Sequence, residues 1–403
     1  MIWFIFLGVA LVWAEEPNQS MLEQYIEQAI TQNPTVQSYR ALLEAEREGV
    51  RQAGFLPEPT ISVAGFVQPI ETKVGPQRAK VGIQQPLPWF GTRTLQQEQA
   101  VLSVRLVEQQ LEEAERQLIW ELKRLWYPMI ELSERQSVLE AHQEILQTVV
   151  QIAERRLESG RGSMVDLIRL DIQQQEIAVE IAVLEQELAS LKEQFNLLSD
   201  ADINHPLVLE NHSVQDSIRF EGKHPSISQF DTQLTRLDVA SKLVEKQYYP
   251  KFGVGLDYIV VGKDSDMSTT GQDAVMPMVS MSIPIYRNKV RSELSEIEHR
   301  KKQVQQLQQA KAQQLQRANA QAEFVWRRGE EQLTLYQTQR DKTKQSMDLL
   351  LRAYTTDETS FEGILALEQQ LLTYERKILI TTRDMKLTKA EQEWLRGGWN
   401  DQQ

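Results

Sequence analysis

The chain has 403 residues, a formal net charge of −13 at pH 7, 41% hydrophobic residues and no cysteine. The lack of cysteine excludes disulfides, thiolate catalysis and zinc–thiolate sites, and the acidic balance argues against nucleic acid or anionic lipid as partners. Beyond the N-terminus, no apolar stretch reaches the length of a transmembrane helix.

The first 14 residues, MIWFIFLGVALVWA, form a short apolar segment with small residues near its end. Such a segment is typical of a secretory signal peptide, although the usual positively charged start is missing. We therefore expect residues 1–14 to be a signal peptide and the mature chain to be exported. A buried N-terminal helix is the alternative, which the following Glu15-Glu16-Pro17 disfavours.

Residues 15–200 are predicted to form a helix, two strands and two long helices. The strands are expected at 60–68 and 78–87, where apolar residues alternate with small or polar ones. The long helix is expected at 91–157 and its return helix at 163–198. Both carry apolar residues with the heptad spacing of coiled coils, and the longer one would extend about 100 Å at about 1.5 Å per residue.

After a linker at 201–216, residues 217–403 repeat this plan. A helix is followed by strands at 251–261 and 276–286, a long helix at 288–354 and a return helix at 360–396. Pro86 corresponds to Pro284, and Ser163 to Ser360, at a spacing of about 200 residues. The sequence therefore predicts a tandem duplication.

The strands of the second half have one apolar face. The residues expected to face lipid are Phe252, Val254, Leu256, Tyr258, Val279, Met281 and Ile283. The opposite face carries small residues, among them Gly253 and Gly255, which favour an open lumen.

Four such strands cannot close a barrel alone, because small membrane barrels begin at about eight strands. An open edge in hydrocarbon would also leave backbone groups unpaired. Strands in a membrane therefore require oligomerisation. The alternative is a soluble chain whose apolar strand face packs on its own helices.

Seven motifs occur in a duplicated order: Asn33-Pro34, AGFLPEPTIS, QQPLPWFG, SGRGSMVDL, YYPKFGVG, SIPIYRNKVR and TSFEGIL. By these motifs the chain resembles the outer-membrane efflux channel (TolC) family over essentially its whole mature length. The PLPWFG variant is similar to members that work in heavy-metal or copper efflux. The resemblance implies a mostly α fold with a small transmembrane β part, in which a homotrimer builds a 12-stranded β-barrel continued by an α-helical barrel.

The resemblance also implies a function. The trimer would be a passive duct of a tripartite efflux system, located in the outer membrane with its helical part in the periplasm. It would dock on a periplasmic adaptor (membrane fusion) protein and an inner-membrane transporter, and would export small molecules or metal ions. A soluble periplasmic coiled-coil scaffold or adaptor is the alternative function.

In the family, the turns between long helices meet the adaptor and close the pore. Gly160, Ser163, Asp166 and Leu167 match the family pattern Gly-x-x-Ser-x-x-Asp-Leu. The second turn keeps Ser360, and Gly363 stands where an acidic residue is common. Glu362, Asp166 or Asp171 could take the place of that acidic residue. Carboxylates converging from three chains would attract cations, but Ser163 and Ser360 are equally interpreted as helix N-caps, and Asp166 as a carboxylate stabilised by the helix dipole.

The remaining chemistry predicts no active site. The five histidines lack metal-ligand spacing on a shared face, and no phosphate loop or dinucleotide fingerprint is present. We therefore expect no catalytic residues, no cofactor, no metal site and no enzymatic activity.

Overall fold

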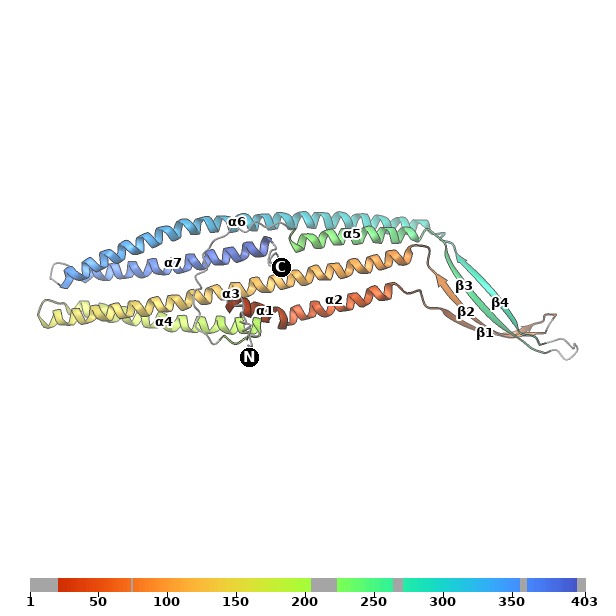
Figure 1. Ribbon diagram of the computed structural model, residues 1–403, viewed down its shortest axis with the longest axis horizontal. Coiled ribbons are helices and arrows are strands. Elements are labelled where there is room, and N and C mark those ends of the chain that lie inside the picture. The colour runs from red at the N-terminus through yellow and green to blue at the C-terminus, as the bar shows by residue number, and fades with distance from the viewer. Residues whose placement is uncertain (1–20, 74, 204–222, 264–270, 356–360, 397–403) are drawn as a thin grey trace, which may run out of the picture. The chain divides into compact units, whose positions relative to one another are not determined.

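The computed structural model describes residues 21–73, 75–203, 223–263, 271–355 and 361–396. The predicted signal peptide and most of the linker lie outside these ranges. The elements, drawn in Figure 1, are α1 (Met21–Gln32), α2 (Pro34–Ala53), β1 (Thr60–Ile70), β2 (Gln77–Leu87), α3 (Thr92–Glu158), α4 (Met164–Ser199), α5 (Pro225–Lys246), β3 (Lys251–Val261), β4 (Ala274–Ser282), α6 (Arg287–Thr355) and α7 (Phe361–Arg396). Among the described residues, no helix combines the length and apolarity needed to cross a membrane.

The predicted fold class is confirmed for the single chain, which is mostly helical with four antiparallel strands. The four long helices and the first three strands begin and end within two residues of the predicted bounds. The fourth strand differs, because it was predicted at 276–286 and β4 ends at Ser282. Pro284 follows, and a residue without a backbone N–H cannot extend the hydrogen-bonded ladder.

The chain divides into two compact units, which we call the helical unit and the sheet unit. The helical unit comprises Met1–Gln37, Ala114–Gly222 and Gln316–Gln403, and the sheet unit comprises Ser38–Glu113 and Lys223–Leu315. Helices α2, α3 and α6 each contribute residues to both.

The core of the helical unit follows the heptad pattern of the sequence. Leu132, Leu139 and Leu146 of α3 recur at seven-residue intervals and are buried together with Ile177 and Leu184 of α4. Tyr354 at the end of α6 and Ile364 of α7 belong to the same cluster. Apolar side chains at coiled-coil spacing thus pack the helices of this unit against one another.

Two helices begin with the same local device, a polar residue followed by proline. The Oδ1 atom of Asn33 accepts a hydrogen bond from the backbone N–H of Thr35 at 2.9 Å, where α2 begins. The Nδ1 atom of His224 accepts one from the N–H of Ser226 at 3.2 Å, where α5 begins. Proline suits the first position of a helix because its missing N–H would have no partner there.

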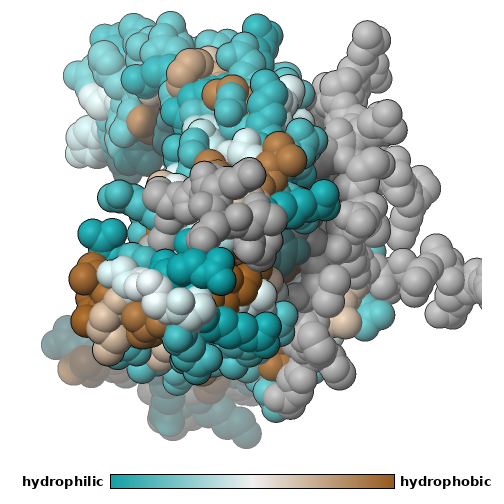
Figure 2. Space-filling view, turned by 90° about the vertical axis from the view of Figure 1, so that its left-hand side faces the viewer, coloured by the Kyte–Doolittle hydropathy of each residue, from teal (hydrophilic) through white to brown (hydrophobic). Residues whose placement is uncertain are grey.

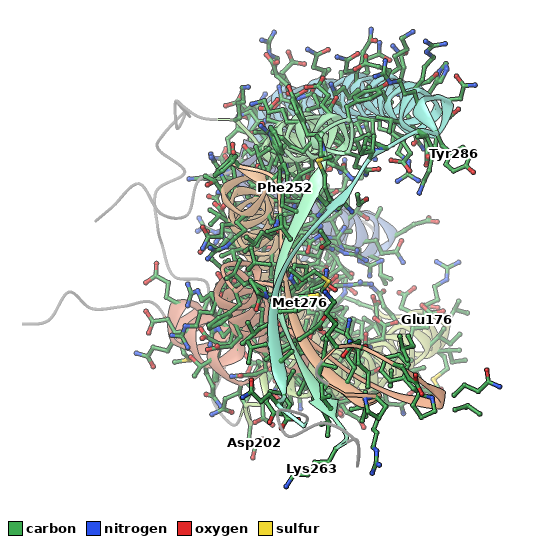
Figure 3. The ribbon with its side chains drawn as sticks, turned by 90° about the vertical axis from the view of Figure 1, so that its right-hand side faces the viewer. Glu176, Asp202, Phe252, Lys263, Met276 and Tyr286 are labelled. Atoms are coloured by element: carbon green, nitrogen blue, oxygen red, sulfur yellow. The ribbon has the colours of Figure 1, made fainter. Side chains whose placement is uncertain are left out.

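The sheet has the order β1-β2-β3-β4, and all neighbouring strands are antiparallel. Ile61 pairs with Ile83, Ile83 with Leu256, and Leu256 with Pro277, so these four side chains form one row across the sheet. β1 and β4 are the outer strands, and each has one neighbour among the described strands. Figure 3 looks onto the sheet, with Phe252 near the start of β3 and Lys263 beyond its far end.

Candidate functional site

One face of the sheet is apolar and exposed. Exposure of the predicted lipid-facing residues runs from 37% for Phe252 to 77% for Val279. Phe252, Val254, Leu256 and Tyr258 of β3 pair with Met281, Val279, Pro277 and Val275 of β4. Ile61 and Val63 of β1 and Val81 and Ile83 of β2 extend this face, and all four are exposed. The face is therefore continuous across all four strands.

Ile283 is the exception among the predicted lipid-facing residues. Its side chain is 63% exposed, but it lies beyond Ser282, where β4 ends. The alternating pattern of the sequence predicts a strand that continues through Pro284, but the hydrogen-bonded ladder of β4 ends at Ser282. Among the described strands, Ile283 therefore has no partner that fixes it to this face.

The opposite face of the sheet carries small and polar side chains. The Nε2 atom of Gln84 donates a hydrogen bond to Oγ of Ser280 at 2.5 Å, reaching from β2 to β4 across β3. It passes over Gly253, where an added Cβ would lie 2.6 Å from Oγ of Ser280. Glycine is thus needed at this position, because any side chain would displace the bridge.

The same polar face holds a charged pair. Lys80 of β2 forms an ion pair with Asp257 of β3. Asp257 is only 1% exposed. Gly82 is directly opposite Asp257 in the register, and a Cβ at Gly82 would collide with the Asp257 carboxylate. The glycine therefore gives the carboxylate the space it occupies beside Lys80.

Aromatic rings gather where the sheet meets the helices of the sheet unit. The ring of Trp89 stacks on Tyr249 at a centroid distance of 4.9 Å and on Phe252 at 5.9 Å. Phe90 contacts Trp89 edge-on and is 82% exposed. Rings of this kind are enriched where a membrane protein leaves the hydrocarbon layer.

The turn between α3 and α4 contains four predicted site residues. Gly160 adopts a φ of +74°, in the left-handed region that favours glycine. Oγ of Ser163 accepts a hydrogen bond from the N–H of Val165 at 3.2 Å, so Ser163 is the N-cap of α4. Asp166 is half-buried in the first turn of α4. Leu167 packs against the core of the helical unit, so it cannot present its whole side chain to a partner.

A second feature of this turn was not identified from the sequence. Four apolar residues at the start of α4 are between 51% and 60% exposed, and we call them the tip patch: Met164, Val165, Ile168 and Ile172. Figure 2 shows apolar side chains gathered near the end of the α3–α4 hairpin. The signal in the sequence was the four-residue spacing of Met164, Ile168 and Ile172, a second apolar stripe beside the heptad.

The turn between α6 and α7 is described in part. Ser360 lies outside the described residues. Glu362 is exposed in the first turn of α7. At Gly363 an added Cβ would lie 3.0 Å from Cδ2 of Leu350, so glycine lets α7 approach α6 closely. The structure therefore gives this glycine a packing role.

A polar cluster in the helical unit joins three helices. His142 of α3 lies between two carboxylates of α7: Nδ1 is 2.7 Å from Oε1 of Glu368 and Nε2 is 2.6 Å from Oε2 of Glu375. Gln173 of α4 donates a further hydrogen bond to Glu368. Burial alone would lower the pKa of His142, but the hydrogen bonds and charges of Glu368 and Glu375 raise it to about 9. The imidazole is therefore a buried cation at neutral pH.

This cluster is not a metal site. The two ring nitrogens point to carboxylates on opposite sides, so the three side chains do not converge on one point. Among the described residues, no group of histidine and carboxylate side chains is arranged to hold a metal ion. Sequence reasoning missed the cluster because its members lie on three helices and share no local spacing.

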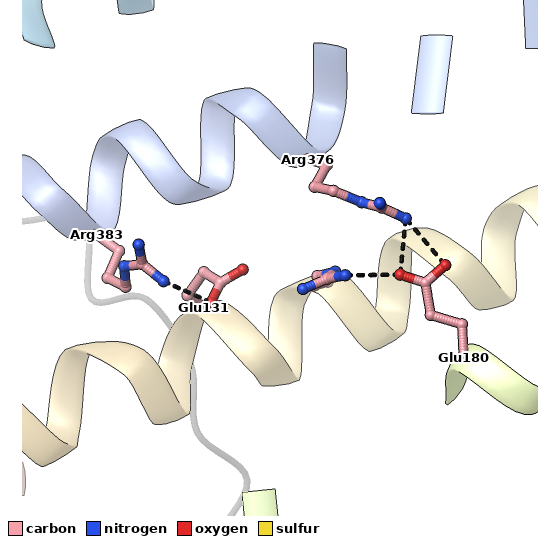
Figure 4. Close-up of polar contacts among 5 residues, drawn as sticks. Glu131, Glu180, Arg376 and Arg383 are labelled. Atoms are coloured by element: carbon pink, nitrogen blue, oxygen red, sulfur yellow. Dashed lines mark hydrogen bonds and ion pairs between the residues drawn. The ribbon is translucent and has the colours of Figure 1, made fainter. Parts of the chain in front are cut away.

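Three more ion pairs join the same helices, and Figure 4 shows them. Oε1 of Glu180 on α4 accepts hydrogen bonds from Arg135 of α3 at 2.6 Å and from Arg376 of α7 at 2.7 Å. Glu131 of α3 pairs with Arg383 of α7 at 3.3 Å. Burial raises the pKa of Glu131, and the charge of Arg383 opposes that rise.

Long coiled-coil helices and an antiparallel four-stranded sheet with one exposed apolar face define the fold of this chain. Solved structures that share this fold include the following three. CusC is 15% identical with a TM-score of 0.76 and matches 94% of this chain and 92% of its own. The outer-membrane channel OprN is 17% identical with a TM-score of 0.76 and matches 94% of this chain and 90% of its own. VceC, an outer membrane protein of Vibrio cholerae, is 14% identical with a TM-score of 0.74 and matches 94% of this chain and 96% of its own.

The sequence comparison adds a family match. Residues 25–198 match the family model described as outer membrane efflux protein. No curated protein matches the sequence at a significant level. The resemblance predicted from the motifs is thereby confirmed, and so is the prediction of a channel protein rather than an enzyme.

Proposed function

We propose that three copies of this chain form a passive outer-membrane channel of a tripartite efflux system. The observation that carries this proposal is the open sheet, with one exposed apolar face, one polar face and two outer strands. Placing β1 of one copy beside β4 of the next would pair both edges and direct the apolar face to lipid. Three copies would supply 12 strands, and this number follows the resemblance to the family.

The alternative of a soluble scaffold requires the apolar face to be covered by the chain's own helices. The described helices do not cover it, since Val279 remains 77% exposed and Val63 76% exposed. A contiguous apolar face of this kind on a soluble protein would favour aggregation. The aromatic rings around Trp89 fit the periplasmic boundary of the membrane.

The helical turns are the proposed docking end for the adaptor protein and, through it, for an inner-membrane pump. The tip patch supplies exposed apolar surface there, bordered by Gly160, Ser163 and Asp166. Of the three carboxylates considered for the aperture, Glu362 and Asp171 are exposed and Asp166 is half-buried. Glu362 and Asp171 are therefore the stronger candidates to meet solutes.

Membrane insertion tests the proposal directly. The protein should fractionate with outer membranes, require detergent, elute as a trimer and conduct ions across a planar bilayer. Val279→Asp would place a charge on the lipid face and should prevent assembly, because a charged side chain on that face destabilises a barrel in the membrane. Ser282→Asp, on the polar face of the same strand, is the matched control and should assemble. A detergent-free soluble monomer would contradict the proposal.

Docking is tested separately. Met164→Ser combined with Ile168→Ser should leave the trimer and its conductance intact but reduce export in cells. The control is Glu187→Gln, an exposed position further along α4. Normal export by the double variant would exclude the tip patch as the docking surface.

A further inference from the structure

The Lys80–Asp257 pair has two members of very different exposure. The side chain of Asp257 is 2% exposed, whereas that of Lys80 is 31% exposed. The lysine is therefore the more exposed member of the pair on the polar face of the sheet. At this point the polar face exposes the ammonium group of Lys80, while the carboxylate of Asp257 is buried.

The register makes this arrangement possible. Asp257 lies opposite Gly82 of β2 and Met276 of β4. A Cβ at Gly82 would collide with Oδ1 of Asp257 and would lie 2.9 Å from Oγ of Ser62 on β1. The absence of a side chain at Gly82 lets the carboxylate lie flat over β2, within reach of Lys80.

The pair has uncharged neighbours on the polar face. Gly82 and Met276, which lie opposite Asp257, are uncharged, and so are Gln84, Met278 and Ser280. The other charged residue of this face in the register is Lys251, which lies at the start of β3 opposite Ser282. The net charge that the polar face carries around these two residues therefore depends on how well the positive charge of Lys80 cancels the negative charge of Asp257.

We propose that Lys80 and Asp257 determine the charge specificity of the barrel lumen. This inference rests on the proposed function, because only a closed barrel turns the polar face into a lumen. Lys80 cancels and covers Asp257, so this section attracts neither cations nor anions strongly. Without the lysine, carboxylates from all copies would face the lumen and favour cations.

The natural absence of cysteine permits a local test. Met276, on the polar face directly opposite Asp257, is 42% exposed, and its neighbour Val275, on the apolar face, is 60% exposed. Single-cysteine variants Met276→Cys and Val275→Cys in outer-membrane vesicles would be treated with cationic and with anionic methanethiosulfonate reagents of similar size. The ratio of the two labelling rates reports the potential at the cysteine.

In the Met276→Cys background, Lys80→Gln should raise the cation-to-anion rate ratio, and Asp257→Asn should lower it. A unit charge at this range changes the ratio by about three- to tenfold. The double variant should return the ratio to its starting value, which also controls for misfolding caused by a single unpaired charge. Equal ratios in both single variants, or shifts in the same direction, would overturn the inference.

Gly82→Ala separates geometry from charge. It leaves the net charge unchanged but forces the carboxylate away from Lys80, so the ratio should rise as it does in Lys80→Gln. Gly65→Ala on β1, where no atom lies within 4 Å of an added Cβ, should leave the ratio unchanged. An unchanged ratio in Gly82→Ala would show that the pair does not depend on this glycine and would contradict the inference.

The two faces distinguish this inference from the proposed function. In a membrane barrel, Met276→Cys reacts and Val275→Cys does not, because charged reagents do not enter hydrocarbon. Labelling of both positions at similar rates would refute the barrel, and the inference would fall with it. Labelling of Met276→Cys alone, with ratios insensitive to Lys80 and Asp257, would refute the inference while the channel stands.

Discussion

His142 and Glu368 are separated by 226 residues in sequence, yet Nδ1 of one lies 2.7 Å from Oε1 of the other. Both side chains are at most 2% exposed. Burying two such groups is favourable only when each is paired. The contact therefore holds α7 on α3 within the helical unit, and Gln173 extends it to α4.

Glu368→Gln keeps the size of the side chain and removes the charge that His142 faces. We expect the free energy of unfolding to fall by about 1–3 kcal/mol, because a buried partner of a charged group is lost. Thermal unfolding followed by helical circular dichroism in detergent measures this loss. Glu362→Gln, exposed on the first turn of the same helix, should change stability by less than about 0.5 kcal/mol. Equal losses in the two variants would contradict a special role for the buried contact.

The raised pKa of His142 predicts how stability depends on pH. The folded-state pKa of about 9 exceeds the unfolded value of about 6.5, so the stabilisation is complete below about pH 6.5 and is lost as pH rises through 9. Raising the pH from about 7 to about 10 should therefore lower the melting temperature more in the natural protein than in His142→Gln. Parallel melting curves for the two proteins over this range would show that His142 is not a cation in the folded state.

Glu180 holds two arginines from different helices, Arg135 and Arg376 (Figure 4). Glu180→Gln would remove the carboxylate that Arg135 and Arg376 share, whereas Arg376→Gln would leave the pair of Glu180 with Arg135 intact. We expect a loss of about 1–3 kcal/mol for the first change and less than about 1 kcal/mol for the second. Chemical unfolding of both variants beside the exposed Glu187→Gln provides the comparison. A larger effect of Arg376→Gln would reverse the assigned order.

The parts of the fold that sequence predicts well are those with a local period. Leu139 and Leu146 recur at heptad spacing and are buried, and Val254 and Leu256 alternate with glycines and lie on one face of β3. In both cases the geometry of the element itself decides which residues share a face. The helix and strand bounds follow from where these periods start and stop.

The contacts that sequence missed depend on which elements become neighbours. His142 meets Glu368 and Glu375, and Gly82 meets Asp257, only because residues from the two halves of the chain are paired. No spacing within one segment encodes such a pairing. Leu167 shows the same limit, since its motif position suggested a surface role while its side chain packs into the core.

The turn between α3 and α4 makes a last prediction, based on two glycines. At Gly162 an added Cβ would lie 2.6 Å from the backbone N of Leu157, and backbone atoms cannot yield as a flexible side chain can. Gly162→Ala should therefore open the turn and speed tryptic cleavage at the adjacent Arg161. At Gly49, inside α2, no atom lies within 4 Å of an added Cβ, so Gly49→Ala should stabilise its helix by up to about 1 kcal/mol without affecting that cleavage. Unchanged cleavage in Gly162→Ala would mean that the turn tolerates a side chain, and that the tip patch is not positioned by this glycine.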